Sequence, residues 1–269
     1  MKNKYILTFV MCMSLLTACN ASGKQEVDKP QEKTEEQGVM TLNNNFRVIN
    51  TMDVDPSAFV EGLVYEDGKI YLSTGLEEHS TLRVINAETG EEEKKIDIPD
   101  QFCEGITILG NYIYQLTWHD GICYVYDKYT LRKLKQFTYR GEGWGITNDG
   151  KNLIMSNGSS KLRFINPVDF SVVKTIDVKD ASGMPVYNIN ELEFVDGKLW
   201  ANVWQQDYLV AINPENGEVH STLQLGDLRS QLAPDNKYAE VLNGIAYNPK
   251  DKTFLITGKF WGKIFEIQL

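Results

Sequence analysis

Five related phrases recur along the chain, and each begins with a residue that could bind a ligand or take part in catalysis. These leading residues are two carboxylates, one indole and two amides, in the order Glu61, Glu104, Trp144, Asn190 and Asn243. Trp118, Trp204 and Lys259 lie at or beside a second equivalent position, fourteen residues further on. A carboxylate can carry a proton between substrate atoms, while amides and an ammonium can stabilise a developing negative charge. The phrases therefore predict either proton-transfer catalysis or small-ligand binding.

Each of these residues also has a structural interpretation. A tryptophan at a strand end often packs between sheets, as we expect for Trp200 and Trp261, and a glutamate can accept hydrogen bonds from backbone amides. Packing alone favours repetition of one residue type, whereas the leading positions carry carboxylates, amides and an indole. Phe59 and Phe102 stand just ahead of the two glutamates. We therefore interpret the whole set as an apolar pocket with a few polar groups, which is typical of small-ligand sites.

The elements that must position these residues have the pattern of strands. Each phrase runs into a turn, such as Asp67-Gly68, and then into a second apolar segment, such as residues 69–74. Another hairpin follows in each repeat, which makes four strands at a period of roughly 40–50 residues. No segment shows a sustained helical period. The sequence thus predicts an all-β, five-bladed β-propeller over residues 41–269, with equivalent positions meeting at one opening.

The two ends of the folded part complement each other. The last repeat ends at Leu269 after three strands, and residues 46–53 form a strand that has no blade of its own. We therefore predict that this N-terminal strand completes the last blade, since pairing the two removes a free sheet edge. The longest irregular inserts, residues 180–190 and 226–240, both precede a phrase and either overhang the opening or form plain surface loops.

The N-terminal segment has the features of a targeting signal. Lys2 and Lys4 precede a short apolar run, too short for a permanent membrane span, that ends just before Cys19. Small residues ahead of the cysteine resemble a bacterial lipobox. We expect residues 1–18 to be a lipoprotein signal peptide, Cys19 to carry the lipid, and residues 19–40 to form a flexible polar tether. The protein would then be exported and lipid-anchored to a bacterial membrane, on its periplasmic or cell-surface side. The alternative is an ordinary signal peptide with an incidental cysteine.

Charge and composition restrict the partners and the chemistry. With 37 acidic and 27 basic residues the net charge is −10, which excludes a nucleic-acid binder because such a protein needs a basic face. The three histidines lie too far apart in sequence to favour a histidine-rich metal site. Cys103 and Cys123 form either a disulfide or two buried thiols, and the sequence leaves both open. We expect a monomer.

Eight phrases, taken in order, resemble the plant-type glutaminyl-peptide cyclotransferases. The phrases are Phe59-Val-Glu-Gly-Leu63, Phe102-Cys-Glu-Gly-Ile106, Gln115-Leu-Thr-Trp118, Gly143-Trp-Gly-Ile-Thr147, Asn190-Glu-Leu-Glu193, Trp200-Ala-Asn-Val-Trp204, Leu242-Asn-Gly-Ile-Ala246 and Thr257-Gly-Lys259. The resemblance covers about residues 45–269. It implies a five-bladed propeller that converts the N-terminal glutamine of peptide or protein substrates to pyroglutamate, with loss of ammonia.

The resemblance also implies roles for individual residues. Glu104 falls on the catalytic acid/base, and Asn190 and Lys259 fall on its polar catalytic partners. The substrate-binding aromatic wall falls on Phe59, Phe102, Trp118, Trp144 and Trp204. Glu61 departs from the family, which commonly has glutamine there, and we place it among the substrate-binding residues. The resemblance implies that no cofactor or transition metal is required, and it leaves room for a structural calcium ion.

Two other functions remain open from the sequence. One is a surface-tethered propeller that binds a peptide or sugar without chemistry, since many propellers are recognition platforms. The other is a metal-dependent, lactonase-like propeller in which Glu61, Glu104, Asn190 and Asn243 would supply oxygen ligands to one axial ion.

Overall fold

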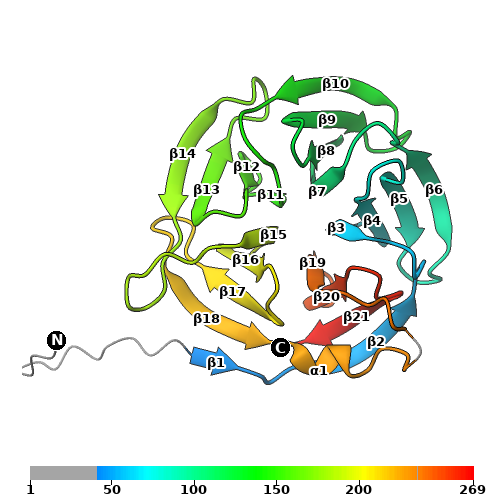
Figure 1. The fold of residues 1–269 in the computed structure, drawn as a ribbon, viewed down its shortest axis with the longest axis vertical. Helices are drawn as coiled ribbons and strands as arrows, with labels where there is room; N and C mark the ends of the chain where they lie inside the picture. Colours follow the sequence, from blue (N-terminus) through cyan, green and yellow to red (C-terminus); the bar gives the residue numbers. More distant parts are fainter. Residues whose placement is uncertain (1–40, 235) are drawn as a thin grey trace, which may run out of the picture. The chain divides into compact units, whose positions relative to one another are not determined.

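The computed structural model describes residues 41–234 and 236–269, and within them 21 strands form five sheets. Figure 1 shows these sheets around a common centre, with one strand of each sheet innermost. The first three blades are β3 (Val60–Glu66), β4 (Lys69–Thr74), β5 (Thr81–Asn86) and β6 (Glu92–Asp97); β7 (Cys103–Leu109), β8 (Tyr112–Thr117), β9 (Ile122–Asp127) and β10 (Lys133–Thr138); and β11 (Ile146–Asn148), β12 (Leu153–Met155), β13 (Lys161–Ile165) and β14 (Val172–Asp177).

The last two blades contain the N-terminal part of the described chain. They are β15 (Ile189–Val195), β16 (Lys198–Val203), β17 (Tyr208–Ile212) and β18 (Val219–Gln224), followed by β19 (Leu242–Asn248), β20 (Thr253–Gly258), β21 (Lys263–Gln268) and β2 (Arg47–Asp53). β2 pairs antiparallel with β21, from Arg47 opposite Gln268 to Asp53 opposite Lys263. The five-bladed propeller and its closure by an N-terminal strand are therefore confirmed.

One strand was not predicted. β1 (Thr41–Asn43) runs parallel to β18 and adds a fifth strand to the fourth blade. Because β18 is otherwise an edge strand with unpaired backbone groups, the chain leading to β2 covers that edge on its way to the last blade. In residues 41–234 and 236–269 the one helix is short, α1 (Gly226–Arg229), and it lies in the insert before β19. Among the described residues, no helix is long and apolar enough to cross a membrane. The predicted signal peptide, lipidated Cys19 and tether lie outside the described residues.

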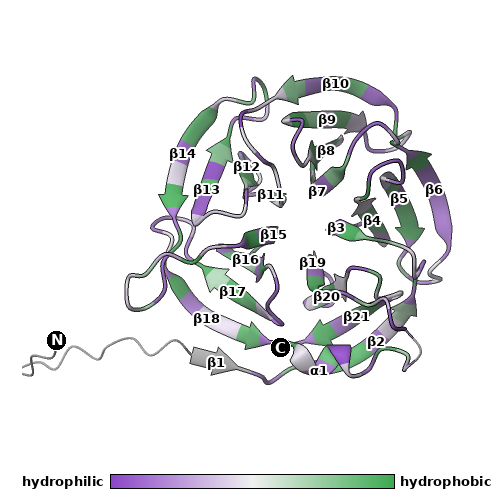
Figure 2. Ribbon diagram, in the orientation of Figure 1, coloured by the Kyte–Doolittle hydropathy of each residue, from purple (hydrophilic) through white to green (hydrophobic). Residues whose placement is uncertain are grey.

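The core lies between blades rather than at the centre of the ring. Each of five apolar clusters joins neighbouring sheets; in one of them Tyr71 and Leu82 of the first blade pack with Ile106 and Ile113 of the second. Outer strands face solvent, and Figure 2 shows the polar residues of β6, which are mostly exposed. Cys103 and Cys123 are buried free thiols of the second blade, so the structure decides between the two states that the sequence left open.

A glycine follows four of the five leading residues, and close packing of the innermost strands requires it. A Cβ atom on Gly105 would lie 2.7 Å from the Trp144 carbonyl oxygen, and one on Gly145 would lie 2.1 Å from the Asn190 carbonyl oxygen. Only glycine permits such contacts. The pairing also shifts by one residue at this point in four blades, which is the pattern of a β-bulge. Bulges redirect side chains, and the bulges of the first two blades lie at Glu61 and Glu104, which line the pocket.

Candidate functional site

Two buried carboxyl groups from neighbouring blades lie at the base of one pocket. Glu61 on β3 is 1% exposed and Glu104 on β7 is 5% exposed. The Lys259 ammonium donates to Glu61 Oε1 over 2.6 Å, and the Asn243 side-chain amide donates to Glu61 Oε2 over 3.0 Å. These two donors favour the ionised form of Glu61.

The two carboxyl groups differ in their tendency to hold a proton. Burial raises the pKa of Glu61 to about 7, and the Lys259 ammonium limits that rise. Burial also raises the pKa of Glu104 well above its usual range, and the Glu61 carboxylate raises it further. A hydrogen bond between the two lowers the pKa of Glu61 and raises that of Glu104, as expected when a protonated acid donates to a carboxylate. When the pair holds one proton, that proton therefore lies on Glu104.

A pocket of about 300 Å³ opens above this pair. Its walls and floor are formed by Phe59, Glu61, Phe102, Glu104, Trp118, Trp144, Trp204, Glu240 and Lys259. Neighbouring rings meet edge-on or tilted, with centroids 6.1 Å apart for Phe59 and Phe102 and 5.8 Å apart for Trp144 and Trp204. The Lys259 ammonium lies 4.2 Å from the centre of the Phe59 ring. The site thus combines a rigid aromatic box with two carboxyl groups and one ammonium.

Of the residues that the sequence placed at the opening, all but Asn190 and Asn243 line the pocket. Asn243 lies against the pocket residue Glu61, to which it donates. Trp118, Trp204 and Lys259 each follow directly on the second strand of a blade, as the hairpin spacing requires. Asn190 does not line the pocket. It is buried, 3% exposed, and its Oδ1 atom has no hydrogen-bond partner among residues 41–234 and 236–269. Trp261 packs in an apolar cluster, as expected.

Two glutamates at the opening were missed by the sequence analysis. Glu240 lines the pocket at the end of the second long insert, where its backbone N–H donates to the Lys259 carbonyl oxygen over 2.9 Å. Glu142 bonds the indoles of Trp118 and Trp144. Both lie outside the repeated phrases, so repeat equivalence gave no signal for them. Glu240 could have been proposed as a pocket residue only from its place in the insert that precedes the last phrase.

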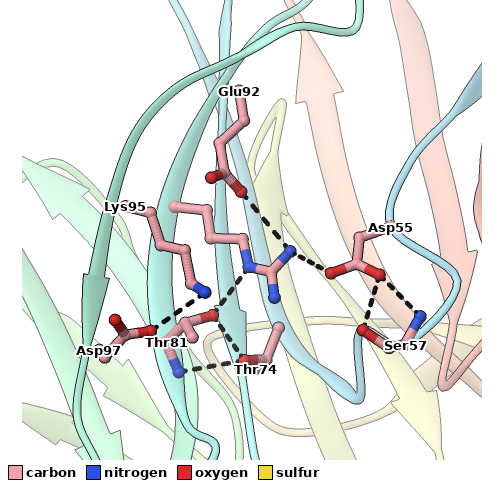
Figure 3. Close-up of polar contacts among 8 residues, drawn as sticks. Asp55, Ser57, Thr74, Thr81, Glu92, Lys95 and Asp97 are labelled. Atoms are coloured by element: carbon pink, nitrogen blue, oxygen red, sulfur yellow. Dashed lines mark hydrogen bonds and ion pairs between the residues drawn. The ribbon is translucent and has the colours of Figure 1, made fainter.

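The loop that carries Phe59 is anchored by a buried arginine. Arg83 on β5 bonds Asp55 over 2.7 Å and also contacts Glu92 and Thr81 (Figure 3). Asp55 in turn accepts hydrogen bonds from the backbone N–H and hydroxyl of Ser57. These hydrogen bonds and the Arg83 guanidinium hold the pKa of Asp55 at about 2 against the opposing effect of burial. The network fixes the turn between β2 and β3, and so the wall of the pocket.

A second pair of carboxyl groups lies on β15, where Glu191 is buried and Glu193 partly buried, and neither lines the pocket. Glu191 accepts the backbone N–H of Ile245 over 2.7 Å and that of Leu63 over 3.4 Å, which ties the fourth blade to the fifth and first. Glu193 accepts the backbone N–H of Tyr247 over 3.0 Å. Burial raises the pKa of Glu191 well above its usual range and that of Glu193 to about 8.

The surroundings of Glu61 disfavour the axial metal site that the sequence left open. One Glu61 oxygen is bonded to the Lys259 ammonium, and the Asn243 amide turns an N–H toward the other. A divalent cation would have to displace that ammonium. Within the part of the chain that the structure describes, no group of three or more His, Cys, Asp or Glu residues is arranged to hold a metal ion.

Comparisons with known proteins agree with the fold. Residues 14–269 match the family described as Glutamine cyclotransferase. A glutaminyl-peptide cyclotransferase of Arabidopsis thaliana is 35% identical over 231 residues, which cover 84% of this chain and 72% of the relative. The crystal structure of Myxococcus xanthus glutaminyl cyclase superposes with a TM-score of 0.79 at 31% identity, covering 86% of this chain and 98% of that one. The chain therefore belongs to the glutamine cyclotransferase family.

Proposed function

We propose that this protein is a glutaminyl-peptide cyclotransferase in which Glu104 moves the proton. The reaction converts an N-terminal glutamine to pyroglutamate and releases ammonia. The observation that carries the mechanism is the buried pair of Glu61 and Glu104 at the base of an aromatic pocket, beside Lys259. Family membership supplies the reaction, and this geometry supplies the group that can serve it.

The chemistry needs a group that accepts one proton and donates another. The substrate's α-amine nitrogen attacks its own γ-amide carbon, a C–N bond forms, and the bond to the amide nitrogen breaks. The attacking nitrogen loses a proton and the leaving nitrogen gains one, so that ammonia departs. A protonated carboxyl group carries a donor oxygen and an acceptor oxygen. Glu104 can therefore donate to the leaving nitrogen and accept from the attacking one, and it ends in its starting state.

The aromatic walls contribute through geometry. Both reacting groups belong to one substrate residue, so the site has only to select the folded rotamer in which amine and carbonyl meet. A pocket of about 300 Å³ lined by Phe59, Phe102 and the three indoles suits a single side chain in such a conformation. Lys259 is the cation nearest the pair, and we assign it to stabilising the oxyanion that develops on the carbonyl oxygen. Asn190 remains a predicted partner in that role.

Ammonia release from a peptide that begins with glutamine tests the proposal. We expect turnover with the free N-terminus and none when the same peptide is acetylated, because acetylation removes the nucleophile. Activity should survive EDTA. A binding module would retain the peptide without releasing ammonia, and a metal-dependent lactonase-like enzyme would lose its activity with the chelator. Either result would contradict the proposal.

We also propose that the protein is exported and lipidated at Cys19. The support is the basic N-terminus, the short apolar run and the small residues before the cysteine. Metabolic labelling with a fatty acid should label the wild-type protein, and Cys19→Ala should abolish the label. Labelling of Cys19→Ala to the wild-type level would contradict the assignment, as would an unlabelled wild-type protein.

A further inference from the structure

Two walls of the pocket share one hydrogen-bond acceptor. Trp118 follows β8 in the second blade and Trp144 precedes β11 in the third, so their indoles come from different sheets. The indole N–H of Trp118 donates to Glu142 Oε2 over 3.0 Å, and that of Trp144 donates to the same oxygen over 2.8 Å. A single carboxylate atom therefore fixes the distance between two rings that face the substrate.

The second oxygen of Glu142 is engaged by the same wall. His119 stacks on the Trp118 indole with ring centroids 3.7 Å apart, and its Nδ1 atom lies 3.5 Å from Glu142 Oε1. On its other side Trp144 packs against the backbone of Gly158, where a Cβ atom would lie 2.6 Å from the indole ring. Carboxylate and backbone thus hold Trp144 from two directions.

The bonds to Glu142 matter because an indole has one polar atom, and the hydrogen bond made by that atom sets the rotation of the ring within its packing contacts. A tryptophan N–H at an apolar cavity needs an acceptor, and hydrogen bonds to an ionised acceptor are the stronger kind. Without Glu142 the two N–H groups would turn to water or into the pocket. The rings would then no longer present one fixed surface to the glutamine side chain.

We propose that Glu142 is a positioning residue that holds the Trp118 and Trp144 indoles in the arrangement that selects the reactive substrate rotamer. This inference rests on the proposed function and deepens it. Glu142 acts through the two rings and touches no reacting atom. Its side chain is 41% exposed, so its replacement leaves the core of the protein intact.

The test combines removal of the acceptor with removal of the donors. We expect Glu142→Ala to lower kcat/KM for a glutamine-initiated peptide about tenfold or more. Glu142→Gln keeps an oxygen acceptor and should stay within about threefold of wild type. In a Trp118→Phe, Trp144→Phe background, which lacks both N–H donors, Glu142→Ala should cause no further loss. Glu77→Ala removes an exposed carboxylate beside Trp118 and serves as the charge control.

Two kinetic results would overturn the proposal. One is wild-type kcat/KM in Glu142→Ala, and the other is an equal loss in the double-Phe background, because Glu142 would then act independently of the indoles. Tryptophan fluorescence gives a readout that does not depend on turnover: Glu142→Ala should shift the emission to the red, and the shift should vanish in the double-Phe background. Absence of ammonia release by the wild-type protein would contradict the proposed function, while an unshifted emission would contradict the positioning role.

Discussion

Two pairs of glutamates with raised pKa values lie on the innermost strands of this propeller, and they differ in what they bind. The upper pair, Glu61 and Glu104, lines the pocket and is bonded to side chains, among them the Lys259 ammonium. The lower pair, Glu191 and Glu193, accepts backbone N–H groups of neighbouring blades. Burial raises the pKa of all four. Burial and a perturbed pKa therefore do not by themselves identify a catalytic carboxyl group.

A catalytic carboxyl group is distinguished from a structural one by its hydrogen-bond partners and by whether it faces a cavity. A carboxyl group that accepts backbone N–H groups holds strands together, and its loss leaves those donors unsatisfied. A carboxyl group that faces a pocket and shares a proton with a second one can exchange that proton with a substrate. The comparison predicts that mutations in the upper pair change turnover, whereas mutations in the lower pair change stability.

The largest effect should come from Glu104→Gln. We expect kcat for a glutamine-initiated peptide to fall by about 10²–10⁴-fold, since the proton shuttle is lost, while the urea midpoint of unfolding stays near that of wild type. Glu193→Gln is the matched control, because it makes the same change in a glutamate of the lower pair. Near-wild-type turnover by Glu104→Gln would remove Glu104 from the mechanism.

The next largest effect is a loss of stability, which we expect from a mutation in the lower pair. Glu191→Ala leaves the backbone N–H groups of Ile245 and Leu63 without their acceptor and should lower the free energy of unfolding by about 2–4 kcal/mol. Glu191→Gln keeps one acceptor oxygen and should cost less. Urea denaturation followed by circular dichroism measures both. If Glu191→Ala kept full stability and lost turnover instead, the proposed division between the pairs would be wrong.

The pH dependence of stability follows from the raised pKa values. For Glu193 burial raises the pKa from 4.5 in the unfolded chain to about 8 in the folded protein. The folded state therefore binds this proton more tightly, and the stabilisation is full below the unfolded value and is lost as pH rises toward about 8. Thermal unfolding should occur at a lower temperature at pH 8 than at pH 6, and Glu193→Gln should reduce the difference. A stability that rises over this range would contradict the assignment.

The smallest predicted effect separates the two members of the upper pair. The Lys259 ammonium lowers the pKa of Glu61 against the effect of burial. Lys259→Gln should therefore move the Glu61 titration to higher pH, by about one unit or more, and leave Glu193 unchanged. The chemical shifts of ¹³C-labelled glutamate carboxyls, followed through a pH titration, report both groups in one sample. An unchanged Glu61 titration would mean that Lys259 does not control this carboxyl group.

Most of the fold and the pocket could be predicted from the sequence because both follow from a repeat. Equivalent positions of five blades meet at one opening, so the order of Glu61, Glu104 and Trp144 in their phrases was sufficient to group them. β1 could not be predicted, since it fills an edge that exists only after the sheets have formed. Glu142 and Glu240 lie outside the repeat, and their roles depend on contacts between blades.

The roles of Glu191 and Glu193 could not be predicted from the sequence either. Glu191 and Glu193 alternate along β15, which indicates that they share one face of the strand. Their partners, however, are backbone groups on other blades, at sequence positions that no local pattern connects to them. The state of Cys103 and Cys123 likewise depended on the distance between two strands of one sheet, which the spacing of the cysteines does not fix.

The protonation of Glu104 in the resting enzyme tests the central claim most directly. An infrared difference spectrum between wild type and Glu104→Gln at pH 7 isolates the carboxyl group that the substitution removes. We predict that the wild-type protein contributes the C=O stretch of a protonated carboxylic acid, and that a glutamine-initiated peptide perturbs this band. A difference spectrum with only the bands of an ionised carboxylate would contradict the claim that Glu104 holds the proton it is proposed to transfer.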